Sequence, residues 1–188
     1  MKALIIVLVI LVLGGLMVGG KFVSIRNDLA TQKEDINRSW SDIDADLQRR
    51  ADLIPNLVET VKGYAKEETG VMETIAQSRS AMLNAQTPQQ KIDAYNQMNS
   101  ALGRLLVVVE NYPNLKANQN FQSLQFQLEG TENRILQARR RYNEAIQRYN
   151  TTLSLFPNNI VAALSGYTRN DAYFKTDVSA RSAPAVKF

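Results

Sequence analysis

The sequence contains neither cysteine nor histidine. Without cysteine, the chain has no disulfide bond, no thiol chemistry and no lipid-modified cysteine that could act as an anchor. Without histidine, it lacks the usual general base and the most common metal ligand of proteins. Few enzyme classes remain after these two absences. We therefore predict a protein that is not an enzyme, with no catalytic residues, no cofactor and no metal site.

A large excess of one charge is also missing. The chain has 22 basic and 18 acidic residues, a formal net charge of +4, so the basic residues are almost balanced. Nucleic-acid-binding proteins concentrate basic residues on one face or stripe. The aromatic residues here follow apolar helical stripes and are not interleaved with basic ones. We predict that nucleic acid is not a partner.

Residues 3–20 form a run of eighteen residues without a charge, bracketed by Lys2 and Lys21. At a helical rise of about 1.5 Å per residue, this run and the two apolar residues after Lys21 cross a bilayer core of roughly 30 Å. A cleaved secretory signal has an apolar core of about 7–15 residues and an Ala-x-Ala-like cleavage site. This run is longer and ends in a glycine-rich sequence, so we expect residues 1–23 to be a retained transmembrane anchor.

The orientation and the packing of this anchor are separate questions. Lys2 and the N-terminal amine compete with Lys21 and Arg26, so the flanking basic charge is nearly balanced and both orientations stay open. Gly15 and Gly19 have the small-xxx-small spacing that lets membrane helices approach closely. Because such a pair also arises by chance in apolar segments, Gly15 and Gly19 are candidates for membrane-helix packing and nothing more.

The rest of the chain divides into helical stretches at its prolines. Proline is tolerated in the first turn of a helix and breaks a helix interior, so the prolines after the anchor mark helix boundaries. Thr87, Pro88 and Gln90 form a capping-box pattern, and Asn118 is a candidate N-cap. These signals predict four helices, over residues 24–50, 53–85, 88–112 and 119–156, with a kink at Gly63 to Gly70 in the second.

The last predicted helix has the most regular apolar pattern. Its large apolar residues recur every seven positions, at Phe121, Leu128, Ile135, Tyr142, Tyr149 and Phe156. Such a repeat indicates a long helix that packs against other helices along its length. Together the stretches predict an all-α fold: an N-terminal transmembrane helix that continues into an antiparallel up-down four-helix bundle over residues 24–157. Residues 158–188 are expected to form a short helix and an extended tail.

An extended coiled coil is the alternative arrangement for these helices. A coiled coil needs an uninterrupted seam of apolar residues. Pro55, Pro88 and Pro113 would interrupt that seam at three places. The compact bundle is therefore the preferred prediction.

Several specific motifs follow one another along the chain. The longest are residues 40–44 (WSDID), 52–65 (DLIPNLVETVKGYA) and 109–118 (VENYPNLKAN), and shorter ones lie at residues 120–121, 131–133, 138–139, 142–143, 149–150 and 156–157. In content and order these motifs resemble the LemA family of bacterial proteins. The resemblance covers nearly the whole chain. One departure is Ala51, where the family more often carries a larger ring.

The resemblance implies a single-pass protein of the bacterial inner membrane with an antiparallel helical bundle. No enzymatic activity is established for the family, and some relatives are associated with magnetosome membranes or with peptide display. No family residue has a settled catalytic role. The resemblance therefore carries no site residue over to this chain.

Two charged clusters could bind a ligand or could simply be surface charges that face water and their counter-ions. Asp42, Asp44, Asp46 and Asp52 could bind a divalent cation, but an acidic, solvated face paired with Arg49 and Arg50 accounts for them. The basic residues Arg139, Arg140, Arg141 and Arg148 could attract anionic lipid or an acidic partner. Glu132 and Glu144 can neutralise them.

These observations lead to one hypothesis and one alternative. The hypothesis is a membrane-anchored scaffold that contacts membrane lipid and assembles with itself, as a homo-oligomer, or with an unidentified envelope protein. The alternative is a membrane-tethered binding module that captures a peptide or a lipid in a groove between helices. In the alternative, the apolar residues 160–164 would act as a lid.

Overall fold

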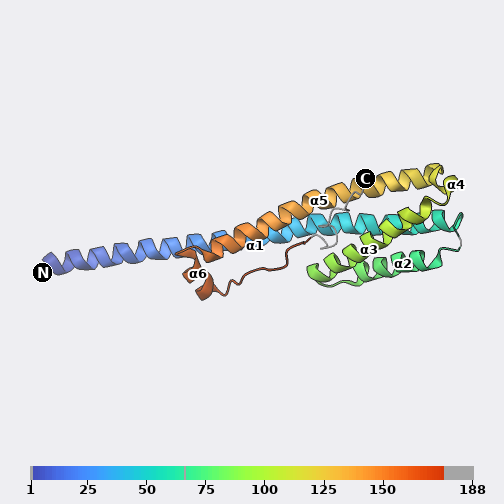
Figure 1. The fold of residues 1–188 in the computed structure, drawn as a ribbon. Helices are drawn as coiled ribbons and strands as arrows, with labels where there is room; N and C mark the ends of the chain where they lie inside the picture. The colour runs from blue at the N-terminus through green and yellow to red at the C-terminus, as the bar shows by residue number, and fades with distance from the viewer. Residues whose placement is uncertain (1, 66, 176–188) are drawn as a thin grey trace, which may run out of the picture. The chain divides into compact units, whose positions relative to one another are not determined.

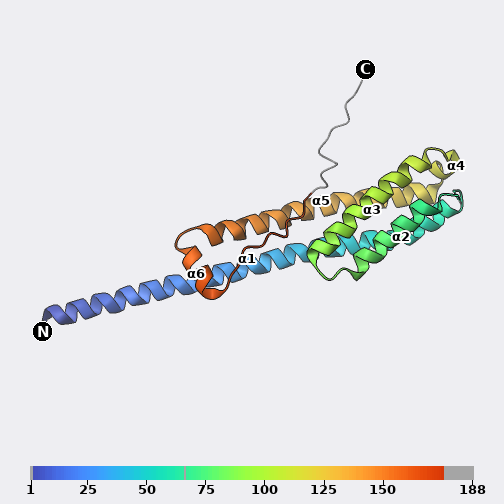
Figure 2. The ribbon, with the colours of Figure 1, turned by 60° about the horizontal axis from the view of Figure 1, so that its bottom comes forward.

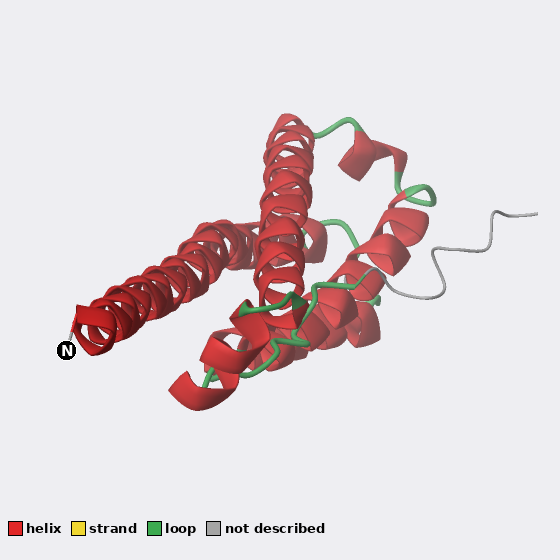
Figure 3. Ribbon diagram, turned by 90° about the vertical axis from the view of Figure 1, so that its left-hand side faces the viewer, coloured by secondary structure: helices red, strands yellow, loops and turns green. Residues whose placement is uncertain are grey.

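The computed structural model describes residues 2–65 and 67–175, and this part of the chain contains helices and loops but no strand (Figures 1 and 3). The predicted all-α class is confirmed. The helices are α1 (Lys2–Lys62), α2 (Thr69–Asn84), α3 (Pro88–Val109), α4 (Pro113–Lys116), α5 (Gln119–Ser154) and α6 (Asn158–Ser165). The expected short helix after residue 157 is α6. The end of the expected tail lies outside the described residues.

Helix α1 begins in the apolar run and continues for 61 residues. At about 1.5 Å per residue it is about 90 Å long. Residues 2–21 are all exposed, and α1 is the one helix of the described residues that is long and apolar enough to cross a membrane. The prediction of one long apolar N-terminal helix that continues into the polar part of the chain is confirmed.

The predicted break before residue 53 is wrong, because α1 runs through Pro55 and ends at Lys62. Proline has no N–H group, so it cannot donate the helical hydrogen bond to the carbonyl oxygen four residues earlier. That acceptor is the oxygen of Ala51, and the Nε of Arg79 on α2 donates to it at 2.9 Å. A side chain from another helix thus replaces the donor that Pro55 lacks.

The expected kink at Gly63 to Gly70 is a full interruption. After Lys62 the chain turns, and α2 begins at Thr69, so the predicted helix 53–85 is divided between α1 and α2. The capping box at Thr87 and Gln90 is confirmed, with Pro88 at the first position of α3. The Oδ1 of Asn118 accepts from the backbone N–H of Phe121 at 3.1 Å, which confirms the predicted cap of α5.

The described residues form two compact units, and α1 and α5 contribute to both. The first unit contains residues 2–38 and 143–171, and the second contains residues 39–142 and 172–175. In the second unit, the contacts give the directions of the helices. Arg141 and Arg134 of α5 pair with Asp42 and Asp46 of α1, at 3.9 and 3.5 Å. Because the residue numbers rise on one helix as they fall on the other, the two segments are antiparallel.

Helix α3 runs in the same direction as this part of α1. Lys91 of α3 pairs with Asp44, and Asn99, further along α3, contacts Arg50. Helix α2 joins α3 through residues 85–87 and lies beside it (Figures 1 and 2). The core of the second unit is aliphatic and aromatic and contains Ile43, Leu47, Ile54, Ile75, Met98, Leu105, Leu115 and Phe121.

The seven-residue repeat of α5 is buried at its first five positions, from Phe121 to Tyr149. Its sixth position is different, because 79% of Phe156 is exposed. Helix α5 ends at Ser154, so Phe156 no longer follows the helical period that aligns the other five. The prediction that Phe156 belongs to the buried stripe is wrong.

The first unit buries Ile25, Leu29 and Ile36 of α1 together with Ile146 of α5 and Val161 of α6. Helix α6 ends at Ser165, and the next residue, Gly166, has a φ of 74° in the left-handed region that suits glycine. The segment after α6 is held by α5. The Asn150 side chain donates to the carbonyl oxygen of Asn170 at 2.7 Å and accepts from its N–H at 2.9 Å. The Tyr149 hydroxyl donates to the carbonyl oxygen of Thr168 at 3.0 Å.

The bond between Arg79 and Ala51 leads to a prediction about Pro55. Replacing Arg79 with alanine leaves the carbonyl oxygen of the buried Ala51 without a donor, so we expect the free energy of unfolding to fall by about 1–3 kcal/mol. In a Pro55→Ala background, residue 55 has its own N–H for this oxygen. Arg79→Ala should then cost less than half as much, as measured by urea unfolding of the full chain in detergent.

Arg104→Ala is the matched control, because Arg104 is an exposed arginine of α3. It should change the unfolding free energy by no more than about 0.5 kcal/mol. An equal loss on Arg79→Ala with and without the Pro55→Ala substitution would show that Arg79 does not compensate for the proline.

Candidate functional site

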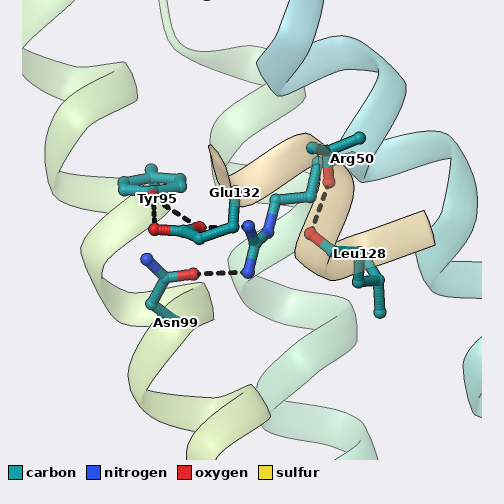
Figure 4. A network of polar contacts seen from close by, with 6 residues as sticks. Arg50, Tyr95, Asn99, Leu128 and Glu132 are labelled. Atoms are coloured by element: carbon teal, nitrogen blue, oxygen red, sulfur yellow. Dashed lines mark hydrogen bonds and ion pairs between the residues drawn. The ribbon is translucent and has the colours of Figure 1, made fainter. Parts of the chain in front are cut away.

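Four polar side chains from three helices meet inside the second unit (Figure 4). The Nη1 of Arg50 on α1 forms an ion pair with Glu132 on α5. The Nη2 of Arg50 donates to the Oδ1 of Asn99 on α3 at 2.8 Å. The hydroxyl of Tyr95, one turn before Asn99 on α3, lies 2.7 Å from both carboxylate oxygens of Glu132. We call these four residues the Arg50 network.

Arg50 stands in the network because it lies on the buried stripe of α1. Ile36, Ile43 and Leu57 are buried, and Arg50 follows Ile43 by seven residues and precedes Leu57 by seven. Only 6% of Arg50 is exposed. The predicted pairing of Arg50 with the solvated acidic face is wrong, because its partners are Glu132 and Asn99. The signal that could have corrected it was a charged residue at an apolar position of the repeat.

The electrostatics of the network are asymmetric. The Arg50 side chain is 7% exposed, whereas the Glu132 side chain is 42% exposed and can reach water. Burial raises the pKa of Tyr95, and the negative charge of Glu132 raises it further, while Arg50 lowers it. Tyr95 therefore stays protonated and keeps donating to Glu132. The guanidinium carbon of Arg50 also lies 5.6 Å from the centre of the Tyr95 ring, within cation–π range.

One donor of the network has no partner among the described residues. The Nε of Arg50 is buried and makes no hydrogen bond within the part of the chain that the structure describes. Buried donors without a partner are uncommon in folded proteins. The neighbours of Arg50 therefore satisfy its guanidinium only in part.

A groove of about 300 Å³ adjoins the network, between α1, α3 and α5. Its apolar wall is made of Leu57, Leu102, Leu105, Leu106, Phe121 and Leu128. Its polar residues are Arg50, Gln125, Glu129, Glu132 and Asn133. The lining comes from the second unit and contains no residue of α6. Residues 160–164, the predicted lid, therefore do not line this groove. The groove suits an apolar group that carries a polar end.

Phe174 packs between Tyr95 of the network and Arg139 of α5. It is buried, and its ring meets the Tyr95 ring edge-on with a centroid distance of 5.5 Å. The guanidinium of Arg139 lies 5.6 Å from the centre of the Phe174 ring. Arg141 pairs with Asp42 at the surface, so two residues of the basic cluster on α5 have partners within the second unit.

The four aspartates of the first acidic cluster do not converge. Asp42, Asp44 and Asp46 pair with Arg141, Lys91 and Arg134 respectively. Asp52 accepts a hydrogen bond from Gln48 at 3.0 Å. The expected partners Arg49 and Arg50 are not among these contacts. Within the described ranges, no group of three or more acidic side chains is placed to hold a metal ion.

The candidate membrane-packing residues Gly15 and Gly19 lie in the exposed apolar part of α1. A Cβ atom added at either position would meet nothing within 4 Å in this chain. Their surface is therefore open to a neighbouring helix. Whether these glycines pack against another membrane helix stays a prediction.

Together these features define an all-helical protein with one apolar N-terminal helix long enough to cross a membrane, and with a buried ionic network among the helices that follow. The chain belongs to the LemA family, whose family model matches residues 39–188. The resemblance seen in the sequence is thus confirmed.

Named relatives support the same assignment. Magnetosome protein MamQ 2 of Paramagnetospirillum magneticum is 26% identical, over 79% of this chain and 64% of the relative. Protein LemA of Metamycoplasma hominis is 26% identical, over 75% of this chain and 65% of the relative. Magnetosome protein MamQ of Magnetospirillum gryphiswaldense is 23% identical, over 76% and 62%. The matches span slightly less than two thirds of the length of these relatives.

The asymmetry of the Arg50 network leads to a prediction about stability. Glu132→Ala removes the counter-ion of a buried cation, so we expect the free energy of unfolding to fall by about 3 kcal/mol. Adding Arg50→Met removes the cation as well, and the double variant should be more stable than Glu132→Ala alone. Urea unfolding of the full chain in detergent, followed by circular dichroism, measures both changes.

Glu129→Ala is the control for this experiment, because Glu129 lines the same groove but belongs to none of the ion pairs of the network. We expect it to change the unfolding free energy by less than about 0.5 kcal/mol. The single variant Arg50→Met is measured as well. If the losses of unfolding free energy of the two single variants add up to that of the double variant, the Arg50 and Glu132 side chains are not coupled.

Proposed function

We propose that this chain is a non-enzymatic, membrane-anchored helical scaffold that assembles with itself or with another protein of the bacterial envelope. The observation that carries the proposal is α1. One unbroken helix contains the exposed apolar run at its start and Arg50 near its end. The segment that would lie in lipid is therefore covalently and helically continuous with the folded part. The names of the relatives, which describe magnetosome proteins and no enzyme, support this proposal.

The proposal includes an architecture and a location. We infer that residues 39–62 of α1 form an up-down four-helix bundle with α2, α3 and the first part of α5. The antiparallel pairing of α1 with α5 and the parallel course of α1 and α3 support this arrangement. We further propose that α1 crosses the bacterial inner membrane once. Its exposed, uncharged residues 3–20 support a single pass.

Assembly through α1 gives the first test of this proposal. If Gly15 and Gly19 line a contact between copies, isoleucine at both positions should push the helices apart and lower the oligomer fraction about tenfold. The full chain, extracted in mild detergent, is measured by mass photometry. The structure allows the substitution, because both positions are surrounded by open space.

The matched control places isoleucine at Gly14 and Gly20. These glycines have equally open surroundings. Gly14 lies about 100° around the helix from Gly15, and Gly20 lies about 100° from Gly19. The control should keep the oligomer. A wild-type chain that is monomeric in both detergent and lipid nanodiscs would contradict self-assembly.

A second candidate function is capture of a peptide or a lipid, and the groove next to Arg50 favours it. Its leucines and Phe121 can cover an apolar group, and Gln125 and Glu129 of the same groove can contact a polar atom of the same ligand. In this function α1 would tether the groove near the membrane.

The groove makes its own prediction. Leu106 lines the groove and is partly exposed, whereas Val107 is exposed and does not line it. Leu106→Trp should fill part of the groove and abolish co-purification of a bound peptide or lipid, while Val107→Trp should retain it. Native mass spectrometry of the full chain detects the bound molecule. A wild-type chain that carries no such molecule after mild extraction would contradict capture.

A further inference from the structure

The turn before α6 and α6 itself expose four large apolar side chains. Leu155, Phe156, Ile160 and Leu164 are 55%, 79%, 50% and 74% exposed. The opposite side of α6 packs into the first unit, where Val161 and Ala162 are buried. Helix α6 is therefore apolar on both sides, and one of these sides has no cover within the described residues.

The segment around α6 is also free of charge. No charged residue lies between Arg148 and Arg169, although charged residues make up 21% of the chain. At that average, the twenty residues 149–168 would carry about four charges. A surface that faces only water would not need this exclusion. The absence of charge and the exposure of large apolar side chains occur in the same segment.

The position of α6 suggests what covers it. Figures 1 and 2 both show α6 beside α1, next to the end of its apolar N-terminal stretch. Along α1, residues 2–21 are exposed, Phe22 is half-buried and Ile25 is the first buried residue. Ile25 follows Gly20 by five residues, which is about 7.5 Å of helix. The interfacial layer of a bilayer extends about 5–8 Å beyond each side of the hydrocarbon core. The first buried residue of α1 would therefore lie within or just beyond this layer.

We propose that Leu155, Phe156, Ile160 and Leu164 form a second membrane contact, and that they insert into the interfacial layer of the same bilayer that α1 crosses. This inference rests on the proposed membrane anchoring by α1. Apolar elements bind to this layer by removing their surface from water, and α1 keeps this surface at the membrane. Asn158, Asn159 and Ser165 provide polar groups for the headgroups. Because the segment is uncharged, the contact needs no anionic lipid.

This contact would do something that the anchor alone cannot. A single transmembrane helix can tilt and rotate in a bilayer. The first unit contains both the apolar stretch of α1 and α6, so two contacts on one unit would fix the rotation of α1 about its axis and limit its tilt. The face that the first unit turns toward the membrane would then be set.

The absence of native cysteine makes the test direct, because each introduced cysteine is a unique labelling site. Phe156→Cys and Leu164→Cys are spin-labelled in the full chain, reconstituted in vesicles of zwitterionic phosphatidylcholine. Phe126→Cys is the matched water reference, because Phe126 is 76% exposed in the second unit. Val18→Cys is the lipid reference. The measurement is the ratio of accessibility to oxygen, which concentrates in lipid, and to a water-soluble nickel complex.

We expect this ratio to be about threefold or more higher at positions 156 and 164 than at position 126. A ratio equal to that at position 126 overturns the inference. Protection from both oxygen and nickel also overturns it, since a second copy or another protein would then cover the segment. If Val18 itself is exposed to water, the proposed anchoring fails, so the two failures are distinguishable.

A polar variant completes the test. Ile160→Cys serves as the reporter, and Phe156→Asp with Leu164→Asp adds two charges to exposed positions that the fold does not need. We expect the reporter to lose its lipid accessibility, while the Val18 reporter and the helical content by circular dichroism stay unchanged. A reporter that keeps its lipid accessibility beside two carboxylates contradicts the proposed contact.

Discussion

The charge of Arg50 is the constraint on which the second unit depends. An arginine with 6% of its surface exposed needs a counter-ion and acceptors nearby. Glu132 of α5 and Asn99 of α3 provide them, and Tyr95 orients the carboxylate of Glu132. Because these groups come from three helices, this set of contacts forms in only one relative register of the three. The apolar contacts around the network would tolerate small shifts along the helices, but the paired charge would not.

The continuity of α1 connects this network to the exposed apolar run at the start of the same helix. A proline inside a helix normally ends or bends it, and Pro55 lies only five residues after Arg50. Helix α1 passes through this position because Arg79 donates to the oxygen of Ala51. Two arginines therefore support the same region of α1, one through a buried ion pair and one through a replaced backbone hydrogen bond. Both act on the helix whose other end is the exposed apolar run.

The proposals of scaffold, groove and second membrane contact describe different surfaces of one chain. The scaffold proposal uses the glycine face of the apolar run, the groove uses the wall beside Arg50, and the membrane contact uses the uncharged segment around α6. Membership of the LemA family supports a role at a membrane without selecting among these surfaces. The relatives named as magnetosome proteins match this chain over less than two thirds of their own length.

The sequence by itself determined the elements whose signals are local. The apolar run of residues 3–20, the capping box at Thr87, the cap at Asn118 and the buried repeat from Phe121 to Tyr149 depend on neighbours within a few turns of one helix. Tertiary structure alone decided where α1 ends, because the donor that replaces the N–H of Pro55 comes from Arg79 on another helix. It also decided that Arg50 is buried, since its partners lie on α3 and α5. Phe156 left the repeat because α5 ends two residues before it, and the exposed segment that contains it became visible only in the fold.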